Sequence, residues 1–228
     1  MARGLLVFDM DGVLVDVKES YRETIRATVQ HFSGQEVTHE QIQEYKNAGG
    51  WNNDWLLSQK ICADRSLEVE FATVVKVFNE YFFGNAETPG LMLRERWIAA
   101  PGLLERLNEI YDFAVFTGRL RAEAQMTLDR YASNLRFFAV IGDDDVENSK
   151  PAPDGLLKLR ETHPTGPTLY IGDTIDDARA GQAAGVPFVG IAAKGSYLRD
   201  ELVVALRANN ARAVLDDINH LEDYLPHA

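Results

Sequence analysis

Five short apolar runs constrain the fold of this chain more than any other feature. Each is bounded by Gly, Asp or Pro and is rich in Val, Ile and Phe. This pattern predicts strands that are buried on both faces, as in a parallel sheet. The runs are Gly4–Phe8, Phe113–Phe116, Phe137–Ile141, Thr168–Ile171 and Phe188–Ile191, and Arg212–Leu215 is a candidate sixth strand.

Apolar residues at helical spacing lie between these runs, for example Leu103, Leu104, Leu107 and Ile110. Strands that alternate with helices predict an α/β fold with a Rossmann-like, doubly wound parallel sheet. In such folds, ligands bind outside the carboxyl ends of the strands. We therefore look for functional residues directly after each apolar run.

One long segment, from about residue 17 to about residue 95, interrupts the alternation with helical patterns alone. Its apolar stripes include Tyr21, Ile25 and Val29. The segment is long enough to hold a small core of its own. We therefore expect an all-helical cap over residues 17–95, inserted into a core of residues 1–16 and 96–228. The alternative is that these helices pack on the sheet.

Composition excludes several classes of protein. The chain has 228 residues, with 35 acidic and 23 basic side chains and a net charge of −12. This balance argues against nucleic acid and anionic membranes as partners. The single cysteine, Cys62, excludes an intramolecular disulfide and a multi-cysteine zinc site. Asp9 and Asp11 interrupt the first apolar run, which therefore predicts neither a signal peptide nor a membrane span. We expect a cytoplasmic monomer or homodimer.

The first run leads directly into Asp9-Met10-Asp11-Gly12. Residues two apart on a strand point to the same side, so both carboxylates are expected at one spot. A divalent cation relieves their repulsion, or the two differ in protonation and therefore in role. An EF-hand calcium loop is excluded because Val13 and Ser20 occupy its fifth and twelfth positions.

Three further groups of polar residues follow later in the chain. Thr117-Gly118-Arg119 offers a hydroxyl and a glycine that lets backbone amides approach a ligand. Lys150, before a proline, offers a point charge suited to phosphate. Asp173, Asp176 and Asp177 begin the segment after the Thr168–Ile171 run, and their place at a strand end favours a metal site over a charged helix start.

These four elements in this order resemble the haloacid dehalogenase superfamily of phosphohydrolases, over about two-thirds of the chain. The position and helical character of the insert resemble the subfamily that also holds β-phosphoglucomutase, phosphoglycolate phosphatase and phosphonatase. The resemblance implies a Mg²⁺-dependent phosphohydrolase that acts on a small phosphorylated metabolite through an aspartyl-phosphate. Because Asp11 and the metal-binding aspartates are present, the pattern favours phosphate over halide.

The resemblance also implies roles for individual residues. Asp9 is the expected nucleophile and Asp11 the acid and base. Mg²⁺ is expected on Asp9, the Asp11 backbone carbonyl and Asp173, with Asp177 orienting the metal's waters or ligating directly. Phosphate is expected on Thr117, Gly118 and Lys150.

Two regions of the sequence allow more than one interpretation. Family members often carry Ser-Asn or Thr-Asn where this chain has Thr117-Gly118-Arg119. Arg119 is expected either to contact phosphate or to pair with the acidic loop 143–147. In the insert, the loop around two glycines predicts substrate recognition by Lys46, Gly50, Trp51, Asn52 and Asn53, or a plain helix–helix connection.

Three alternatives to the phosphohydrolase remain. A sugar-phosphate mutase uses the same aspartates but returns the phosphoryl group to a second hydroxyl. A phosphonatase uses a cap lysine, here Lys46, to form a Schiff base. A non-catalytic interaction module uses the scaffold alone. Such modules usually lack one of the catalytic residues, and none is missing from this sequence.

Overall fold

The computed structural model describes residues 3–163 and 166–225. All six candidate strands form one sheet in the order β5-β4-β1-β6-β7-β8, and each neighbouring pair is parallel. The predicted Rossmann-like α/β fold is therefore confirmed. The strands are β1 (Leu5–Phe8), β4 (Asp112–Phe116), β5 (Phe137–Ile141), β6 (Thr168–Gly172), β7 (Phe188–Ile191) and β8 (Ala213–Leu215).

Helices connect these strands and cover both faces of the sheet. From β1 the chain proceeds one way to β4 and β5, and from β6 it proceeds the other way to β7 and β8. Right-handed crossovers then place α5 and α6 on one face and α7, α8 and α9 on the other. The bounds are α5 (Leu103–Ile110), α6 (Arg121–Tyr131), α7 (Asp154–Thr162), α8 (Ile175–Ala184), α9 (Arg199–Ala208) and α10 (Leu221–Tyr224).

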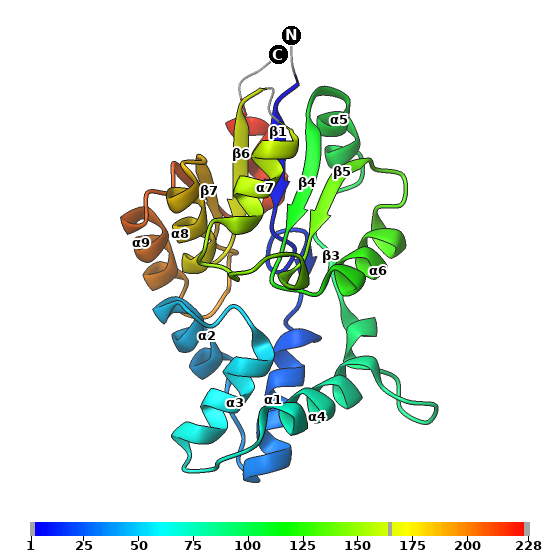
Figure 1. Ribbon diagram of the computed structural model, residues 1–228, viewed down its shortest axis with the longest axis vertical. Helices are drawn as coiled ribbons and strands as arrows, with labels where there is room; N and C mark the ends of the chain where they lie inside the picture. The colour runs from blue at the N-terminus through cyan, green and yellow to red at the C-terminus, as the bar shows by residue number, and fades with distance from the viewer. Residues whose placement is uncertain (1–2, 164–165, 226–228) are drawn as a thin grey trace. The chain divides into compact units, whose positions relative to one another are not determined.

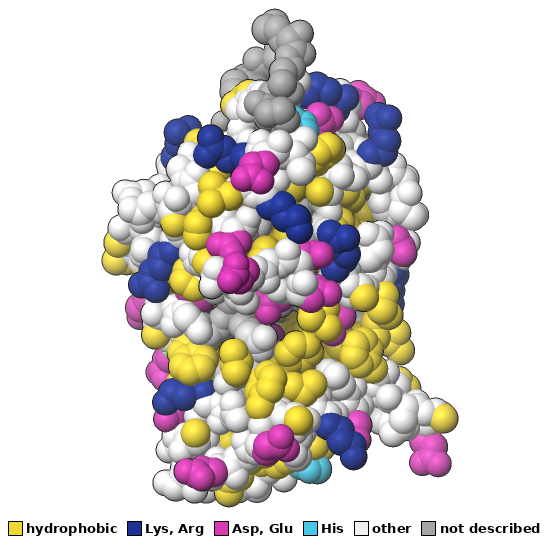
Figure 2. Space-filling view, viewed as in Figure 1, with side chains coloured by type: hydrophobic (Ala, Val, Ile, Leu, Met, Phe, Trp, Pro, Cys, Tyr) yellow, Lys and Arg dark blue, Asp and Glu magenta, His cyan; other side chains and the backbone are white. Residues whose placement is uncertain are grey.

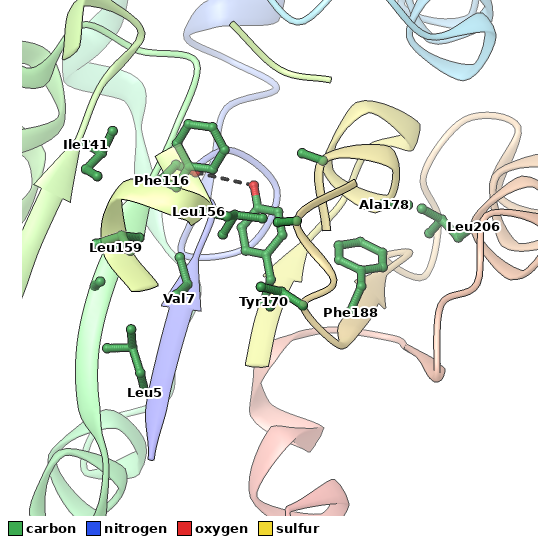
Figure 3. Packing of buried hydrophobic residues seen from close by; sticks show 14 of the residues in the cluster. Leu5, Val7, Phe116, Ile141, Leu156, Leu159, Tyr170, Ala178, Phe188 and Leu206 are labelled. Carbon is green, nitrogen blue, oxygen red and sulfur yellow. Dashed lines mark hydrogen bonds between the residues drawn. The ribbon is translucent and has the colours of Figure 1, made fainter. Parts of the chain in front are cut away.

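The core on the α7–α9 face is continuous from strand to helix. Leu5 and Val7 of β1 pack with Leu156 and Leu159 of α7, and Tyr170 of β6 lies among them (Figure 3). Full burial of a large aliphatic side chain contributes roughly 1.5–3 kcal/mol. This packing therefore holds β1 and β6 in place. The loops that follow these strands begin with Asp9 and Asp173.

The chain divides into two compact units, which we call the core unit (Met1–Val15 and Trp97–Ala228) and the insert unit (Asp16–Arg96). The insert unit contains α1 (Tyr21–Ser33), α2 (His39–Ala48), α3 (Asp54–Asp64) and α4 (Phe71–Phe83), with a 3₁₀ turn at Leu91–Arg94 (Figure 1). Two short strands, β2 (Val15–Asp16) and β3 (Arg96–Trp97), pair where the chain passes between the units.

The insert unit has an aromatic core of its own. Tyr21 of α1 is buried, and its ring lies 4.2 Å from that of Phe82 and 6.3 Å from that of Phe78, both on α4. Tyr21 is therefore a packing residue, as its place on the apolar stripe predicts. Strands β2 and β3 were not predicted, because two residues are too short to show a period-2 pattern.

The acidic excess is spread rather than gathered on the face of the molecule in Figure 2, where Lys and Arg lie among Asp and Glu side chains. Within residues 3–163 and 166–225, no helix is both long and apolar enough to cross a membrane.

Candidate active site

The register of the sheet brings the predicted residues together. Phe8 at the end of β1 pairs with Val115 on one side and with Ile171 on the other. The next residue, Asp9, donates its backbone N–H to the carbonyl of Ile171 at 2.8 Å. The loops after β1, β4 and β6 therefore begin at the same level of the sheet's carboxyl edge, which is where this fold binds ligands.

Lys150 lies at the centre of this edge and joins residues from distant parts of the chain. Its Nζ lies 2.9 Å from Asp9 Oδ1 and 2.7 Å from Asp177 Oδ1. The backbone carbonyl of Phe116 and the hydroxyl of Tyr170 lie 3.2 and 3.1 Å from the same nitrogen. The Lys150 side chain is 1% exposed, so the ammonium depends on these partners in place of water.

Asp177 accepts hydrogen bonds on both carboxylate oxygens. Oδ1 accepts from Lys150 and, at 2.5 Å, from the hydroxyl of Tyr170. Oδ2 accepts from the backbone N–H of Thr174 at 3.0 Å and from its hydroxyl at 2.6 Å. Thr174 is also the N-cap of α8, because its hydroxyl accepts from the Asp177 N–H. These four donors fix the position of the Asp177 carboxylate.

Tyr170 is a site residue that the sequence analysis missed. It lies in the middle of β6, is fully buried, and its hydroxyl reaches Asp177, Lys150 and, at 3.4 Å, the carbonyl of Phe116 (Figure 3). The available signal was a tyrosine in an otherwise apolar strand, since a buried phenol usually has a hydrogen-bond partner.

The burial of the cluster shifts the pKa values of its members. Burial raises the pKa of Asp9 to about 7, although Lys150 pulls it down. Burial also tends to raise the pKa of Asp177, but the Lys150 charge and the hydrogen bonds outweigh it, and the pKa is lowered. Burial tends to lower the pKa of Lys150, but Asp177 and Asp9 outweigh it, so the pKa is raised and Lys150 stays charged.

Two glycines permit the close approach of these side chains. Gly12 has φ +74°, and a Cβ on it would collide with the Asp173 carboxylate. A Cβ on Gly172 would collide with the side chain of Asp177. Packing around the carboxylates therefore requires a glycine at both positions, and the positive φ of Gly12 also favours one there.

The carboxylates suit a divalent cation. Asp9, Asp173 and Asp177 each offer an oxygen, and these three atoms lie within 4.8 Å of one another. Lys150 supplies one positive charge to three carboxylates, which leaves negative charge for a metal to neutralise. A donor set of oxygens alone is what Mg²⁺ prefers. The residues therefore fit the predicted metal, with the Asp11 side chain outside this group.

Thr117 and Arg119 lie in the loop after β4. Thr117 is buried, and its hydroxyl accepts from the backbone N–H of Arg119 at 3.2 Å, with the half-buried Gly118 between them. The Arg119 guanidinium pairs with Asp11. This contact is neither of the two expected for Arg119, phosphate or the acidic loop 143–147. The Arg119 backbone carbonyl meets that loop, where it accepts from the N–H of Asp143.

In the insert unit, the predicted recognition residues have local partners. Lys46 pairs with Asp54 at 2.6 Å, and this ion pair occupies the amine that a Schiff base would use. The Asn53 side chain caps α3 by accepting from the N–H groups of Trp55 and Leu56. Trp51 lies edge-on to Tyr45, Gly50 has φ +83°, and the Asn52 carbonyl lies 3.4 Å from Lys46 Nζ. Their role in substrate selection stays a prediction.

Comparisons with known proteins agree with this geometry. The model of the haloacid dehalogenase-like hydrolase family matches residues 6–191. A phosphoglycolate phosphatase of Aquifex aeolicus is 25% identical, over 79% of this chain and 81% of that protein. An imidazoleglycerol-phosphate dehydratase of Phytophthora nicotianae is 33% identical over 86% of this chain, but the match spans only 45% of that protein. The solved structure of phosphatase Tt82 from Thermococcus thioreducens is 26% identical, with a TM-score of 0.64 over 89% of this chain and 99% of that one.

Proposed function

Because this chain belongs to the haloacid dehalogenase-like hydrolases, we propose that it hydrolyses phosphate monoesters of small metabolites through a phosphorylated Asp9. The observation that carries the proposal is the ammonium of Lys150, which holds both Asp9 and Asp177 at the carboxyl edge of a parallel sheet. A buried lysine between two carboxylates both orients the nucleophile and offers positive charge to an incoming phosphoryl group.

In the first step, an oxygen of Asp9 attacks phosphorus and the bond from phosphorus to the ester oxygen breaks. Asp11 donates its proton to that oxygen, so the alcohol leaves neutral. In the second step, water attacks phosphorus and Asp11 takes the water's proton. The bond from phosphorus to Asp9 breaks, which returns the carboxylate and releases inorganic phosphate.

The remaining residues hold the reacting groups. Lys150 and the Thr117 hydroxyl offset charge on the phosphoryl oxygens, and Asp177 fixes Lys150. Asp9, Asp173 and the Asp11 carbonyl would hold Mg²⁺, which would supply charge neutralisation for the phosphoryl group.

The test is a Mg²⁺-dependent phosphate-release screen over sugar phosphates, nucleotides and amino-acid phosphates. The panel includes 2-phosphoglycolate and imidazole glycerol phosphate, which the names of the relatives suggest. Release of inorganic phosphate supports the hydrolase, whereas formation of an isomeric sugar phosphate supports a mutase. No turnover on any ester at high enzyme concentration would favour the non-catalytic module.

The matched variants are Asp9→Asn and Asp129→Asn. Both exchange a carboxylate for an amide, but Asp129 lies exposed on α6. Asp9→Asn is expected to abolish turnover and to leave the fold intact, and Asp129→Asn to keep turnover. Near-normal activity of Asp9→Asn would rule out the mechanism.

A further inference from the structure

Arg119 is a buried cation whose side chain pairs with the carboxylate of Asp11. The side chain is 2% exposed, and its Nε and Nη2 atoms lie 2.7 and 2.6 Å from Asp11 Oδ1. Its third nitrogen, Nη1, donates to the hydroxyl of Thr127 at 2.9 Å. A buried guanidinium is tolerated only when it is paired and hydrogen-bonded, so this arrangement specifies where the Asp11 side chain lies.

The position of Arg119 is fixed from several sides. Its backbone N–H donates to the Thr117 hydroxyl, and its carbonyl accepts from the N–H of Asp143. Thr127, which holds the guanidinium, is buried on α6. Contacts with the loop after β4, with the acidic loop and with α6 therefore fix the position of Arg119 independently of Asp11.

Asp11, in contrast, lies in the turn after β1 and is only partly buried. Its side chain is 31% exposed, and within the described ranges its side-chain hydrogen bonds all fall on Oδ1. The second oxygen, Oδ2, is left for proton transfer. The two contacts on Oδ1 restrict the orientations that the carboxylate can adopt, which favours positioned general acid catalysis.

We propose that Arg119 is a positioning residue for proton transfer by Asp11. It holds Oδ1, so that Oδ2 gives its proton to the ester oxygen as the bond to phosphorus breaks, and takes a proton from water in the second step. The inference rests on the proposed function, because it assigns Arg119 a task only if Asp11 is the acid and base. It also explains why a buried arginine occupies this position in a loop that otherwise offers small residues.

The experiment separates positioning from general structural damage through the leaving group. Nitrophenolate leaves without a proton, whereas an alkoxide needs one. The value of kcat/KM reports steps up to the first irreversible bond cleavage, so it isolates the step in which Asp11 acts as acid. We therefore compare kcat/KM for 4-nitrophenyl phosphate with kcat/KM for the alkyl phosphate of highest turnover in the panel.

Arg119→Gln is expected to lower kcat/KM for the alkyl ester by about a hundredfold, within the range that a positioned acid contributes, and for the aryl ester by less than about fivefold. The matched control is Arg121→Gln, an exposed arginine two residues later that pairs with Asp145, and it should change neither value. Thr127→Val removes the hydroxyl that accepts from Arg119 Nη1. It should also lower kcat/KM more for the alkyl ester than for the aryl ester, but by a smaller factor than Arg119→Gln.

Asp11→Asn provides the reference for the test. If it lowers kcat/KM for both esters by the same factor, the role of Asp11 in the proposed function fails. If Asp11→Asn discriminates between the esters and neither Arg119→Gln nor Thr127→Val does, the inference about Arg119 fails alone. In the Asp11→Asn background, Arg119→Gln should produce no further loss on the alkyl ester, since both act on one proton transfer. A full additional loss would overturn the proposal.

Discussion

Replacement of Lys150 by methionine tests the charge balance of the cluster. Methionine keeps much of the side-chain length, so the change removes the ammonium with little loss of packing. Lys150 is 1% exposed at the side chain, Asp177 0% and Asp9 5%. Breaking a buried ion pair by removal of one partner costs about 3–5 kcal/mol, because the other charge stays buried and uncompensated. Since typical domains are stable by about 5–15 kcal/mol, this loss is large.

The pH dependence of the loss has a definite sign. With Lys150 present, the pKa of Asp9 already lies above that of the unfolded chain and the pKa of Asp177 lies below it. Without Lys150, the pKa of Asp9 rises further and that of Asp177 rises above its unfolded value. The folded state then binds more protons than the unfolded state at intermediate pH, so stability falls as pH rises. The variant is therefore expected to lose the full amount, about 3–5 kcal/mol of unfolding free energy, at about pH 8 and much less at about pH 5.

The assay is urea unfolding of the metal-free protein at both pH values, with Lys158→Met as the control. Lys158 is an exposed lysine on α7 that donates to the Asp145 carbonyl. The Lys158→Met substitution should change the free energy of unfolding by less than about 0.5 kcal/mol. If the Lys150 variant does not fold at the higher pH, refolding on acidification is the expected result. A loss below about 1 kcal/mol, or an equal loss at both pH values, would refute the reasoning.

Three further predictions concern the metal, the phenol and the turn. Burial raises the pKa of Asp9 to about 7, and Mg²⁺ must displace its proton. The apparent Kd for Mg²⁺, measured by calorimetry, should therefore rise about tenfold for each pH unit below about 7 and stay constant above it. A Kd that is independent of pH would contradict this. Tyr170→Phe removes a hydrogen bond to a buried charge and should lower stability by about 1.5–3 kcal/mol in thermal unfolding. Tyr45→Phe, which removes the exposed bond to Asp64, should cost less than about 1 kcal/mol, and an equal cost would refute the role of burial. Gly12→Ala should weaken Mg²⁺ binding by about tenfold or more by displacing Asp173, at a cost near or above 1.4 kcal/mol. Gly34→Ala has a similar φ of +67° but open space around the added Cβ, so it should leave Mg²⁺ affinity unchanged.

The strands of the core were predictable because each is a buried run that ends at a polar turn. Phe137–Ile141 and Phe188–Ile191 have the predicted bounds, and each of the other four strands differs from its predicted bounds by one residue at one end. The carboxylates of Asp9 and Asp173 were predictable at one edge for the same reason, since parallel strands bring the loops after them together.

Other features needed the three-dimensional arrangement. The partner of Arg119 lies 108 residues earlier in the chain, and no local pattern distinguishes Asp11 from the acidic loop 143–147 as that partner. Tyr170 lies in a strand that predicts only packing, and its role depends on α8 placing Asp177 beside it. The saturation of the Asp177 carboxylate by Thr174, Lys150 and Tyr170 likewise follows from the fold.

The proposed mechanism requires that Asp9 becomes phosphorylated during turnover. Rapid acid quench of the enzyme with its best substrate detects such an intermediate. Peptide mass analysis of the quenched wild-type protein should find one phosphoryl group on the peptide that contains Asp9. The same treatment of Asp9→Asn should find none. A wild-type enzyme that releases phosphate while the Asp9 peptide stays unmodified at every quench time, or a phosphoryl group on another residue, would contradict the account.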